Sequence, residues 1–176
     1  MRFLLAGQSS ERLHYRAVHR KYHEEWLQFM KDPRTNMHWY EPEDPPEVKV
    51  EKWFERQAER YQKGLGGMNA LLTRDTDTFI GHAGLLVQEV NGVEELEVAY
   101  SLLPQAWGHG YATEAARFCR DHAFANNFAD SLISIISVTN EPSKNVARRN
   151  GMQLDFTTKY KGNKVEIYRI HRAGKL

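Results

Sequence analysis

The stretch over residues 96–116 constrains the fold of this chain most strongly. An apolar strand pattern over residues 96–103 stops at Pro104, and a tight segment containing Gly108 and Gly110 leads into a helix of small residues. Glycine has no Cβ atom, so the backbone can approach another group closely at these two positions. A helix N-terminus also directs unpaired N–H groups and the positive end of its dipole at one point. The stretch therefore predicts an anion site, above all for phosphate.

Length and composition define the class of protein. The 176 residues fit one domain, 1–176, and the net charge of +1 argues against nucleic acid as the main partner. Cys119 is the single cysteine, so no internal disulfide forms and a reducing compartment is favoured. The opening apolar run is too short for a signal peptide, and no stretch approaches the roughly 20 apolar residues of a membrane span. We expect a soluble, cytoplasmic protein with no membrane partner.

The first third of the chain predicts one strand and two helices. Alternating apolar residues indicate a strand over 12–18, and helical spacing of apolar residues indicates helices over 22–30 and 47–62. Between these helices, residues 34–46 combine aromatic residues with prolines and acids, which is typical of a loop. This loop either lines a pocket or packs on the core as a flap.

The remainder predicts a mixed sheet. Asn91-Gly92 marks a hairpin, so the strands around it form an antiparallel meander. A helix of small residues and a strand that is apolar on both faces follow, which implies a parallel crossover. The predicted strands span 68–73, 78–89, 94–103, 131–138, 153–159 and 164–172, and the predicted helices span 111–126 and 143–149.

Two motifs identify a family resemblance. Residues 105–115 read Gln-Ala-Trp-Gly-His-Gly-Tyr-Ala-Thr-Glu-Ala, and residues 140–152 hold Asn-x-x-Ser followed by Gly-Met, with Met where relatives carry Phe. Together with Ser-Ser-Glu-Arg-Leu-His-Tyr-Arg at 9–16, they make the chain resemble the GCN5-related N-acetyltransferase (GNAT) superfamily. The closest likeness is the branch that acetylates the N-termini of ribosomal proteins. The resemblance implies an α+β fold with a twisted mixed sheet of about six or seven strands, a splayed parallel pair and about four flanking helices.

The resemblance also implies acetyl-CoA as cosubstrate and no metal. The pyrophosphate would lie on backbone amides, the pantetheine arm would pair with the backbone of the strand before them, and an asparagine would bond the arm. The expected contacts are Ser101, Leu102, Leu103, Gln105 (shaping the turn), Trp107, Gly108, His109, Gly110, Tyr111, Ala112, Asn140, and Lys144 or Asn145 for the phosphates. Three positions have structural alternatives: Trp107 as a packing anchor, His109 as a solvent-facing residue and Asn140 as a helix cap.

The implied reaction is direct attack of a primary amine on the thioester. The amine is cationic at pH 7, so a base must remove a proton, directly or through water. Glu97 is the first choice, because relatives carry Glu at this strand position and a carboxylate stands out in an apolar strand. The alternative is that Glu95 and Glu97 share a solvated face. His82 is the second candidate base, and its alternative is a hydrogen-bonded structural histidine.

The leaving thiolate requires a hydrogen-bond or proton donor. Many relatives use a Tyr seven residues after the motif asparagine, where this chain has Ala147, and the resemblance implies Ser143 instead. The alternative for Ser143 is a first-turn helix residue. Cys119 lies on the sheet-packing face of a predicted helix and is a poor nucleophile.

The sequence thus indicates an acetyl-CoA-dependent N-acetyltransferase, an acyltransferase acting on a protein N-terminus or a small-molecule amine, as a monomer or homodimer. A non-catalytic acyl-CoA sensor is the alternative, and it would keep the loop without the base. The acceptor pocket is expected between the first two helices, the 34–46 loop and the last hairpin. The acidic residues Glu41, Glu43, Asp44 and Glu47 either attract a cationic acceptor or form a solvated surface.

Overall fold

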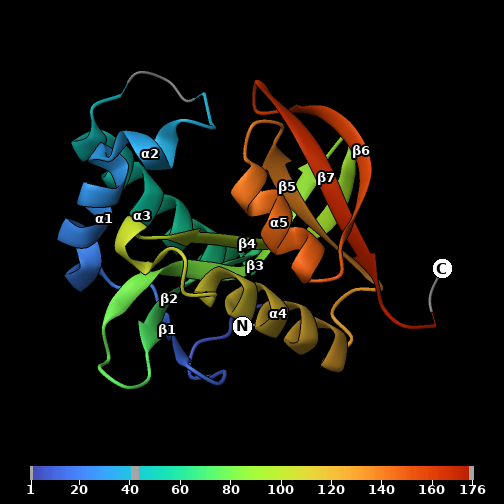
Figure 1. Ribbon diagram of the computed structural model, residues 1–176, viewed down its shortest axis with the longest axis horizontal. Coiled ribbons are helices and arrows are strands. Elements are labelled where there is room, and N and C mark those ends of the chain that lie inside the picture. The colour runs from blue at the N-terminus through green and yellow to red at the C-terminus, as the bar shows by residue number, and fades with distance from the viewer. Residues whose placement is uncertain (1, 41–43, 175–176) are drawn as a thin grey trace.

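One mixed β-sheet organises the protein (Figure 1). The computed structural model describes residues 2–40 and 44–174, and in these ranges seven strands follow the order β1-β2-β3-β4-β5-β7-β6. All neighbours are antiparallel except β4 and β5, which confirms the expected mixed sheet. The strands are β1 (Leu13–Ala17), β2 (Gly66–Thr73), β3 (Phe79–Val90), β4 (Val93–Leu102), β5 (Ser131–Ser137), β6 (Gln153–Tyr160) and β7 (Asn163–His171).

The helices begin and end where the local sequence dictates. In the described ranges they are α1 (His23–Lys31), α2 (Pro33–Asn36), α3 (Pro46–Lys63), α4 (Tyr111–Ala125) and α5 (Glu141–Arg149), with 3-10 turns η1 (Arg20–Tyr22) and η2 (Pro104–Ala106). Pro33 and Pro46 lie in first turns, where a missing N–H costs nothing, and Gly64 ends α3 at a φ of +69°. No helix within the described ranges is long and apolar enough to cross a membrane.

Residues 34–46 are not wholly a loop, and that expectation is corrected by α2. The side chain of Asp32 accepts a hydrogen bond from the N–H of Arg34 at 2.9 Å, which caps the short helix. Pro33 follows directly and presets the first helical φ angle. The Asp-Pro pair that ends α1 therefore also starts α2.

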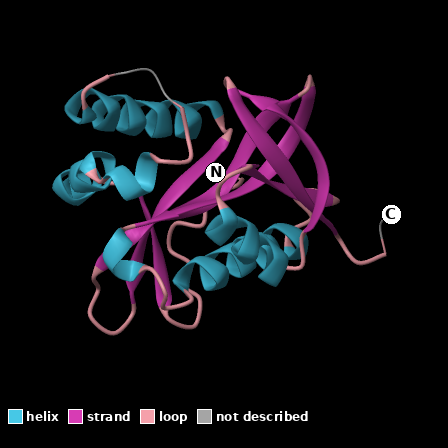
Figure 2. Ribbon diagram, turned by 45° about the horizontal axis from the view of Figure 1, so that its top comes forward, coloured by secondary structure: helices cyan, strands magenta, loops and turns pink. Residues whose placement is uncertain are grey.

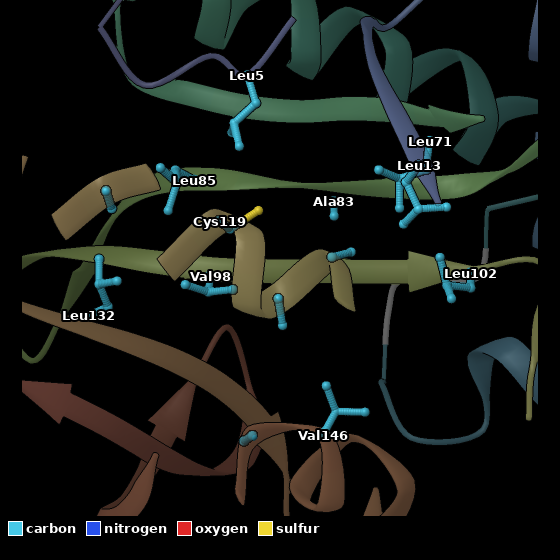
Figure 3. Packing of buried hydrophobic residues seen from close by; sticks show 14 of the residues in the cluster. Leu5, Leu13, Leu71, Ala83, Leu85, Val98, Leu102, Cys119, Leu132 and Val146 are labelled. Atoms are coloured by element: carbon cyan, nitrogen blue, oxygen red, sulfur yellow. The ribbon is translucent and has the colours of Figure 1, made fainter. Parts of the chain in front are cut away.

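Helices cover both faces of the sheet (Figure 2). On one face, α1 and α3 bury Trp26, Val50 and Phe54 against β2 and β3. On the other face, α4 lays its small residues on β3 and β4, and Figure 3 shows Cys119 pointing toward the sheet near Ala83. Small side chains let this helix pack close to the sheet, as its sequence predicts. The burial of both faces fixes which residues of β4 meet which helical layer.

The two halves of the sheet meet at one narrow junction. β4 pairs with β3 from Gly81↔Leu102 to Val90↔Val93, through the Asn91-Gly92 hairpin. In the described chain, the parallel pairing of β4 with β5 is registered only at Glu97↔Ile133. No further β4–β5 partners are registered beyond that pair in the described residues, and Figure 1 shows the two strands running apart; we call the region between their unpaired edges the gap. The splayed parallel pair expected from the resemblance is thereby confirmed.

Candidate functional site

The backbone of β4 faces alternately toward β3 and toward the gap. The N–H of Leu103 donates to the carbonyl of Ile80 at 2.9 Å, so that position faces β3. Antiparallel pairing alternates along a strand, so Ser101 faces β3 as well, whereas Tyr100 and Leu102 face the gap. The expectation that Ser101 and Leu103 offer main-chain contacts is therefore wrong. Sequence patterns do not reveal which alternate residues pair with β3, and Tyr100 was missed for that reason.

The loop after β4, residues 105–110, is shaped by a 3-10 turn and two glycines. Gln105 lies in η2, and the N–H of Trp107 donates to the carbonyl of Pro104 at 3.2 Å. The backbone N–H of Trp107 is therefore already bonded to Pro104. This corrects the expected role of Trp107 as an amide donor to phosphate. Gly108 and Gly110 have φ angles of +80° and +79°, the left-handed region that favours glycine.

The side chain of Trp107 lies at the surface beside the end of β4 instead of anchoring the loop from below. It is 44% exposed, which overturns the packing-anchor alternative. Its Nε1 donates to the carbonyl of Leu102 at 2.8 Å, which satisfies a gap-facing backbone group at the end of β4. The guanidinium of Arg34 lies 5.7 Å from the ring centroid. Trp107 therefore links the end of β4 to the segment around α2.

The N-terminus of α4 presents unpaired amides next to open space. Its first helical hydrogen bond runs from the N–H of Glu114 to the carbonyl of Gly110, at 3.1 Å. The N–H groups of residues 111–113 therefore have no acceptor inside the helix. A Cβ built on Gly108 would meet no described atom within 4 Å, and His109 is exposed. Charge and space at this point fit an anionic group.

A clamp between the segment just before β1 and α4 holds this loop in place. Glu114 accepts hydrogen bonds from the N–H and Nε of Arg12, both at 2.7 Å, and from Ser10 at 2.6 Å. Burial acts to raise the pKa of Glu114, but the bonds from Ser10 and Arg12 outweigh it and leave the pKa below its ordinary value. Arg12 also donates to the carbonyl of His109 at 3.0 Å. Glu114 is thus a structural residue, and the clamp joins segments too distant for sequence patterns to connect.

Glu97 lies buried at the junction of the two half-sheets. It is 8% exposed, so the alternative of a solvated face is wrong for this residue. Its carboxylate accepts hydrogen bonds from Nε2 of Gln88 at 2.8 Å and from the N–H of Ile135. Burial raises the pKa of Glu97, and these hydrogen bonds offset part of that effect. Glu95, two residues earlier, forms an ion pair with Arg169 at 2.7 Å.

His82 is a structural residue without hydrogen-bond partners. Its ring is fully buried among Trp26, Trp53 and Phe79, with centroids 4.3, 4.5 and 5.0 Å away. Neither ring nitrogen has a hydrogen-bond partner among the described residues, so the alternative of a hydrogen-bonded histidine is also wrong. Burial lowers the pKa of His82 to about 3. An enclosed, neutral ring in an aromatic cluster does not support a role as base.

The start of α5 places two hydroxyls against β4. Asn140 caps the helix by accepting from the N–H of Ser143 at 3.1 Å, which confirms the cap alternative. Oγ of Ser143 donates to the hydroxyl of Tyr100 at 3.1 Å, and that hydroxyl donates to the carbonyl of Ser143 at 2.9 Å. Burial raises the pKa of Tyr100, which keeps its hydroxyl protonated. Tyr100 occupies a core-facing position of β4, and the sequence alone does not set this hydroxyl apart.

Lys144 points into the protein. It is 7% exposed, its Nζ donates to the carbonyl of Val138 at 2.8 Å, and it lies 3.0 Å from Glu166. The expected reach of Lys144 to the phosphates is therefore wrong, because the side chain ties α5 to β7. Asn145 is exposed, and its Oδ1 accepts from Arg148 at 3.0 Å.

Residues 37–40, here called the strap, lie against the half of the sheet that contains β5 and β7. His38 bonds Thr139 at 2.9 Å, and Tyr40 exchanges backbone hydrogen bonds with the side chain of Asn163 at 2.7 and 3.0 Å. Trp39 packs on the apolar residues of β5 and β7. Trp39 therefore packs on the core, while the strap contacts the last hairpin.

Two of the four acidic residues near the strap lie in the described ranges, and both form ion pairs with lysines. Asp44 bonds Lys52 at 2.7 Å, and Glu47 bonds Lys31 at 2.8 Å. Glu41 and Glu43 lie outside the described residues. Pairing with lysines favours the solvated-surface interpretation of Asp44 and Glu47.

An open pocket of about 380 Å³ lies between α1 and the end of β4. It is lined by Glu25, Gln28, Phe29, Asp32, Arg34, Leu103, Pro104 and Gln105. The first helix and the region of α2 contribute to it as expected for an acceptor pocket, but neither the second predicted helix, now α3, nor the last hairpin does. It adjoins the predicted cofactor loop through Gln105.

In the described part of the chain, Cys119 is not placed as a reactive thiol and no cluster of metal-binding side chains is found. Cys119 is buried, and burial raises the pKa of its thiol to about 12. No group of three His, Cys, Asp or Glu side chains among the described residues is placed to hold a metal ion. His19 and His23 have helical spacing, but His19 caps η1 and His23 bonds Glu51.

Comparison with known proteins gives consistent matches. The family model of the acetyltransferase (GNAT) domain matches residues 12–153. The uncharacterized protein YkkB of Bacillus subtilis (strain 168) is 30% identical over 112 residues, which cover 62% of this chain and 64% of that protein. The chain thus spans a little under two thirds of the length of the curated relatives that it matches.

Solved structures show the same fold. An acetyltransferase from Agrobacterium tumefaciens str. C58 superposes with a TM-score of 0.78 and 26% identity, covering 94% of both chains. The ribosomal L7/L12 alpha-N-protein acetyltransferase RimL, solved in complex with coenzyme A, has a TM-score of 0.72 and 17% identity and covers 93% of this chain and 96% of that one. With the family match extending over most of the sequence, this chain belongs to the GNAT acetyltransferase family.

Proposed function

We propose that this protein is an acetyl-CoA-dependent N-acetyltransferase that acts on a primary amine, either a protein N-terminus or a small molecule. One observation carries the proposal: a buried carboxylate, Glu97, lies where β4 and β5 part, and an amide-rich loop follows at the end of the same strand. Family membership and the coenzyme A complex of a structural neighbour support it.

The residues at the gap fit acetyl-CoA in two respects. The exposed glycine loop and the first amides of α4 suit a diphosphate without any net basic charge, with Gly108, His109, Gly110, Tyr111 and Ala112 as donors. The gap-facing N–H groups of Tyr100 and Leu102 suit an extended arm that pairs like a further strand, while the carbonyl of Leu102 is already bonded to Trp107. Asn140, the N-cap of α5, and Asn145, in the middle of that helix, are the further proposed contacts of the same cosubstrate. When bound, acetyl-CoA supplies an activated thioester carbonyl.

Glu97 is the proposed general base. An ammonium group must lose a proton before its nitrogen can attack a carbonyl, and a carboxylate with a raised pKa accepts that proton more readily. Its burial keeps the group away from bulk water, which supports a role in proton transfer. General bases of this kind contribute about 10²–10⁴-fold to rate.

Ser143 and Tyr100 are the proposed donors to the leaving thiolate. Their hydroxyls lie 3.1 Å apart on the face of β4 opposite Glu97. In this structure both hydroxyl protons are engaged, because Oγ of Ser143 donates to Tyr100 and Tyr100 donates to the carbonyl of Ser143. One hydroxyl must therefore turn toward the thiolate to stabilise its developing negative charge by hydrogen bonding. Placing base and donors on opposite faces matches a reaction in which the amine enters from one side and the thiol leaves on the other.

The experiment replaces Glu97 with Gln and measures coenzyme A affinity by calorimetry and turnover by thiol release with a panel of amines. We expect Glu97→Gln to keep the affinity and to lower kcat by about 10²–10⁴-fold. Glu95→Gln is the matched control on the same strand and should stay within a few fold of wild type. Wild-type binding without turnover of any amine would favour the alternative, an acyl-CoA sensor. No heat of binding with coenzyme A or acetyl-CoA would refute both functions.

A further inference from the structure

We propose that Gln88 is a positioning residue for Glu97 and that Tyr160, on β6, holds Gln88 in its working orientation. This inference rests on the proposed function and extends it to two residues outside the family motifs. Gln88 lies on β3 and Tyr160 ends β6, so three strands from both halves of the sheet converge on one carboxylate.

The contacts define a single hydrogen-bond direction. Nε2 of Gln88 donates to Oε2 of Glu97 at 2.8 Å, and the hydroxyl of Tyr160 donates to Oε1 of Gln88 at 3.0 Å. An ionised carboxylate only accepts hydrogen bonds, so the NH₂ end of the amide must face Glu97. The oxygen end then faces Tyr160, which has to be the donor. Each partner therefore fixes the orientation of the next.

The hydroxyl of Tyr160 stays a donor throughout the working pH range. Burial and the nearby charge of Glu97 raise the pKa of Tyr160 to about 12. Its proton is therefore present whenever Glu97 is ionised. Without that donor, the Gln88 amide loses the contact that opposes rotation of its NH₂ group away from Glu97.

The other charged groups around Glu97 come from α3 and from the β6–β7 turn. Arg60, on α3, and Lys161, in the turn, both favour the ionised carboxylate, and the N–H of Ile135 donates to it from β5. Nη2 of Arg60 donates to the carbonyls of Leu65 and Val87, so its position is fixed by the backbone. Among the contacts that stabilise the charged form, Gln88 acts most strongly. Removing it should shift the titration of Glu97 toward higher pH.

This network also extends to the strap. The hairpin that carries Tyr160 is the one whose Asn163 holds the strap at Tyr40. The orientation of the base is therefore built on the hairpin that contacts the strap.

The test compares the pH profiles of kcat/KM for wild type, Gln88→Met and Tyr160→Phe. Met keeps the length of the side chain without a donor, and we expect the acid limb to move up by about 1 pH unit, because a hydrogen bond to a charged group contributes about 1.5 kcal/mol. Tyr160→Phe should shift the limb in the same direction by less. Thr158→Val is the matched control on β6, since Thr158 bonds Asn91 at 3.0 Å and not Gln88.

A second readout keeps the inference independent of turnover. The ¹³C chemical shift of the Glu97 carboxyl, followed against pH, should show the same upward shift in Gln88→Met. An unchanged titration in a folded Gln88→Met protein would overturn the positioning role, even with active wild-type enzyme. A shifted titration together with inactive wild type would support the role of Gln88 while refuting the proposed function. If Gln88→Met does not fold, Tyr160→Phe decides by the same two measurements.

Discussion

At the scale of single residues, two buried polar side chains differ in whether they have hydrogen-bond partners. Glu97 is buried with hydrogen-bond donors on two sides, whereas His82 is buried with none. A buried polar atom without a partner costs about 1–3 kcal/mol of stability. The partnered group suits proton transfer at the gap. The unpartnered one instead makes stability depend on pH, because charging it inside an aromatic cluster is unfavourable.

His82 should make the protein sensitive to acid. Its pKa is about 3 in the folded state against roughly 6.5 when unfolded, so between these values the unfolded chain binds more protons. Stability from this residue is thus complete above pH 6.5 and falls as the pH drops, by about 2 kcal/mol at pH 5. Urea unfolding of wild type and His82→Leu measures this.

The comparison separates packing from charge. At pH 8 the imidazole is neutral in both states, so the difference between the two proteins reports packing alone. Between pH 8 and pH 5, wild type should lose about 2 kcal/mol more than His82→Leu. Parallel pH dependence in both proteins would contradict the assignment of this loss to His82.

At the scale of secondary-structure elements, β4 contributes the proposed base and the gap-facing backbone N–H groups to the candidate site. Its pairing with β3 is extensive, whereas its pairing with β5 is short. Toward β3 its backbone is engaged along its whole length, while toward β5 the registered pairing stops at Glu97. Near that point, hydrogen bonds between β4 and β5 involve side chains. The hydroxyl of Ser134 donates to the backbone carbonyl of Val98 at 2.8 Å, and the backbone N–H of Ile135 donates to the carboxylate of Glu97. The backbone ladder ends here, which leaves the end of β4 open for an added strand-like ligand.

The alternation along β4 predicts a pattern of amide exchange. On addition of coenzyme A, the amides of Tyr100 and Leu102 should exchange at least about tenfold more slowly, because they face the gap and gain a partner. The amides of Ser101 and Leu103 are engaged by β3 beforehand and should change little. Hydrogen exchange resolved by NMR reports each amide separately. Equal protection of all four would contradict this placement of the cosubstrate.

At the scale of the whole molecule, two half-sheets are joined by a short parallel junction and by side-chain bridges. The strap reaches the last hairpin through Asn163, and Arg169 on β7 pairs with Glu95 on β4. Separate helical layers cover the sheet on its two faces. A ligand that fills the gap contacts both halves at once, so its binding energy adds to the stability of the entire fold.

Coenzyme A should therefore raise the melting temperature. At a free concentration of 100 times Kd, the free energy of unfolding increases by about 2.7 kcal/mol. For a chain of this size that corresponds to a rise in Tm of roughly 5–11 °C. Differential scanning fluorimetry over a concentration series measures it. Glu97→Gln should give the same rise, since the base is not among the residues proposed to hold the cosubstrate. A Tm independent of coenzyme A would argue against binding in the gap.

The sequence by itself determined the elements and the family. Apolar periodicity placed the strands and longer helices within a few residues, and the Asn91-Gly92 hairpin and the glycine loop at 105–110 formed where predicted. These features depend on the local backbone and on short-range patterns, which neighbouring residues specify on their own. The short helix α2 was missed because its cap, Asp32-Pro33, also reads as a helix end.

Only the tertiary structure decided what each site residue contacts. Lys144 turns inward to Glu166, the backbone of Leu103 is engaged by β3, and Glu97 meets Gln88 and Tyr160 through two other strands. The outcomes for Leu103 and Glu97 depend on strand register, and a shift of one residue would turn every side chain of a strand to the opposite face. The outcome for Lys144 depends on how α5 packs against β7. Register is set by the packing of both sheet faces against distant helices, and that information is not local to any motif.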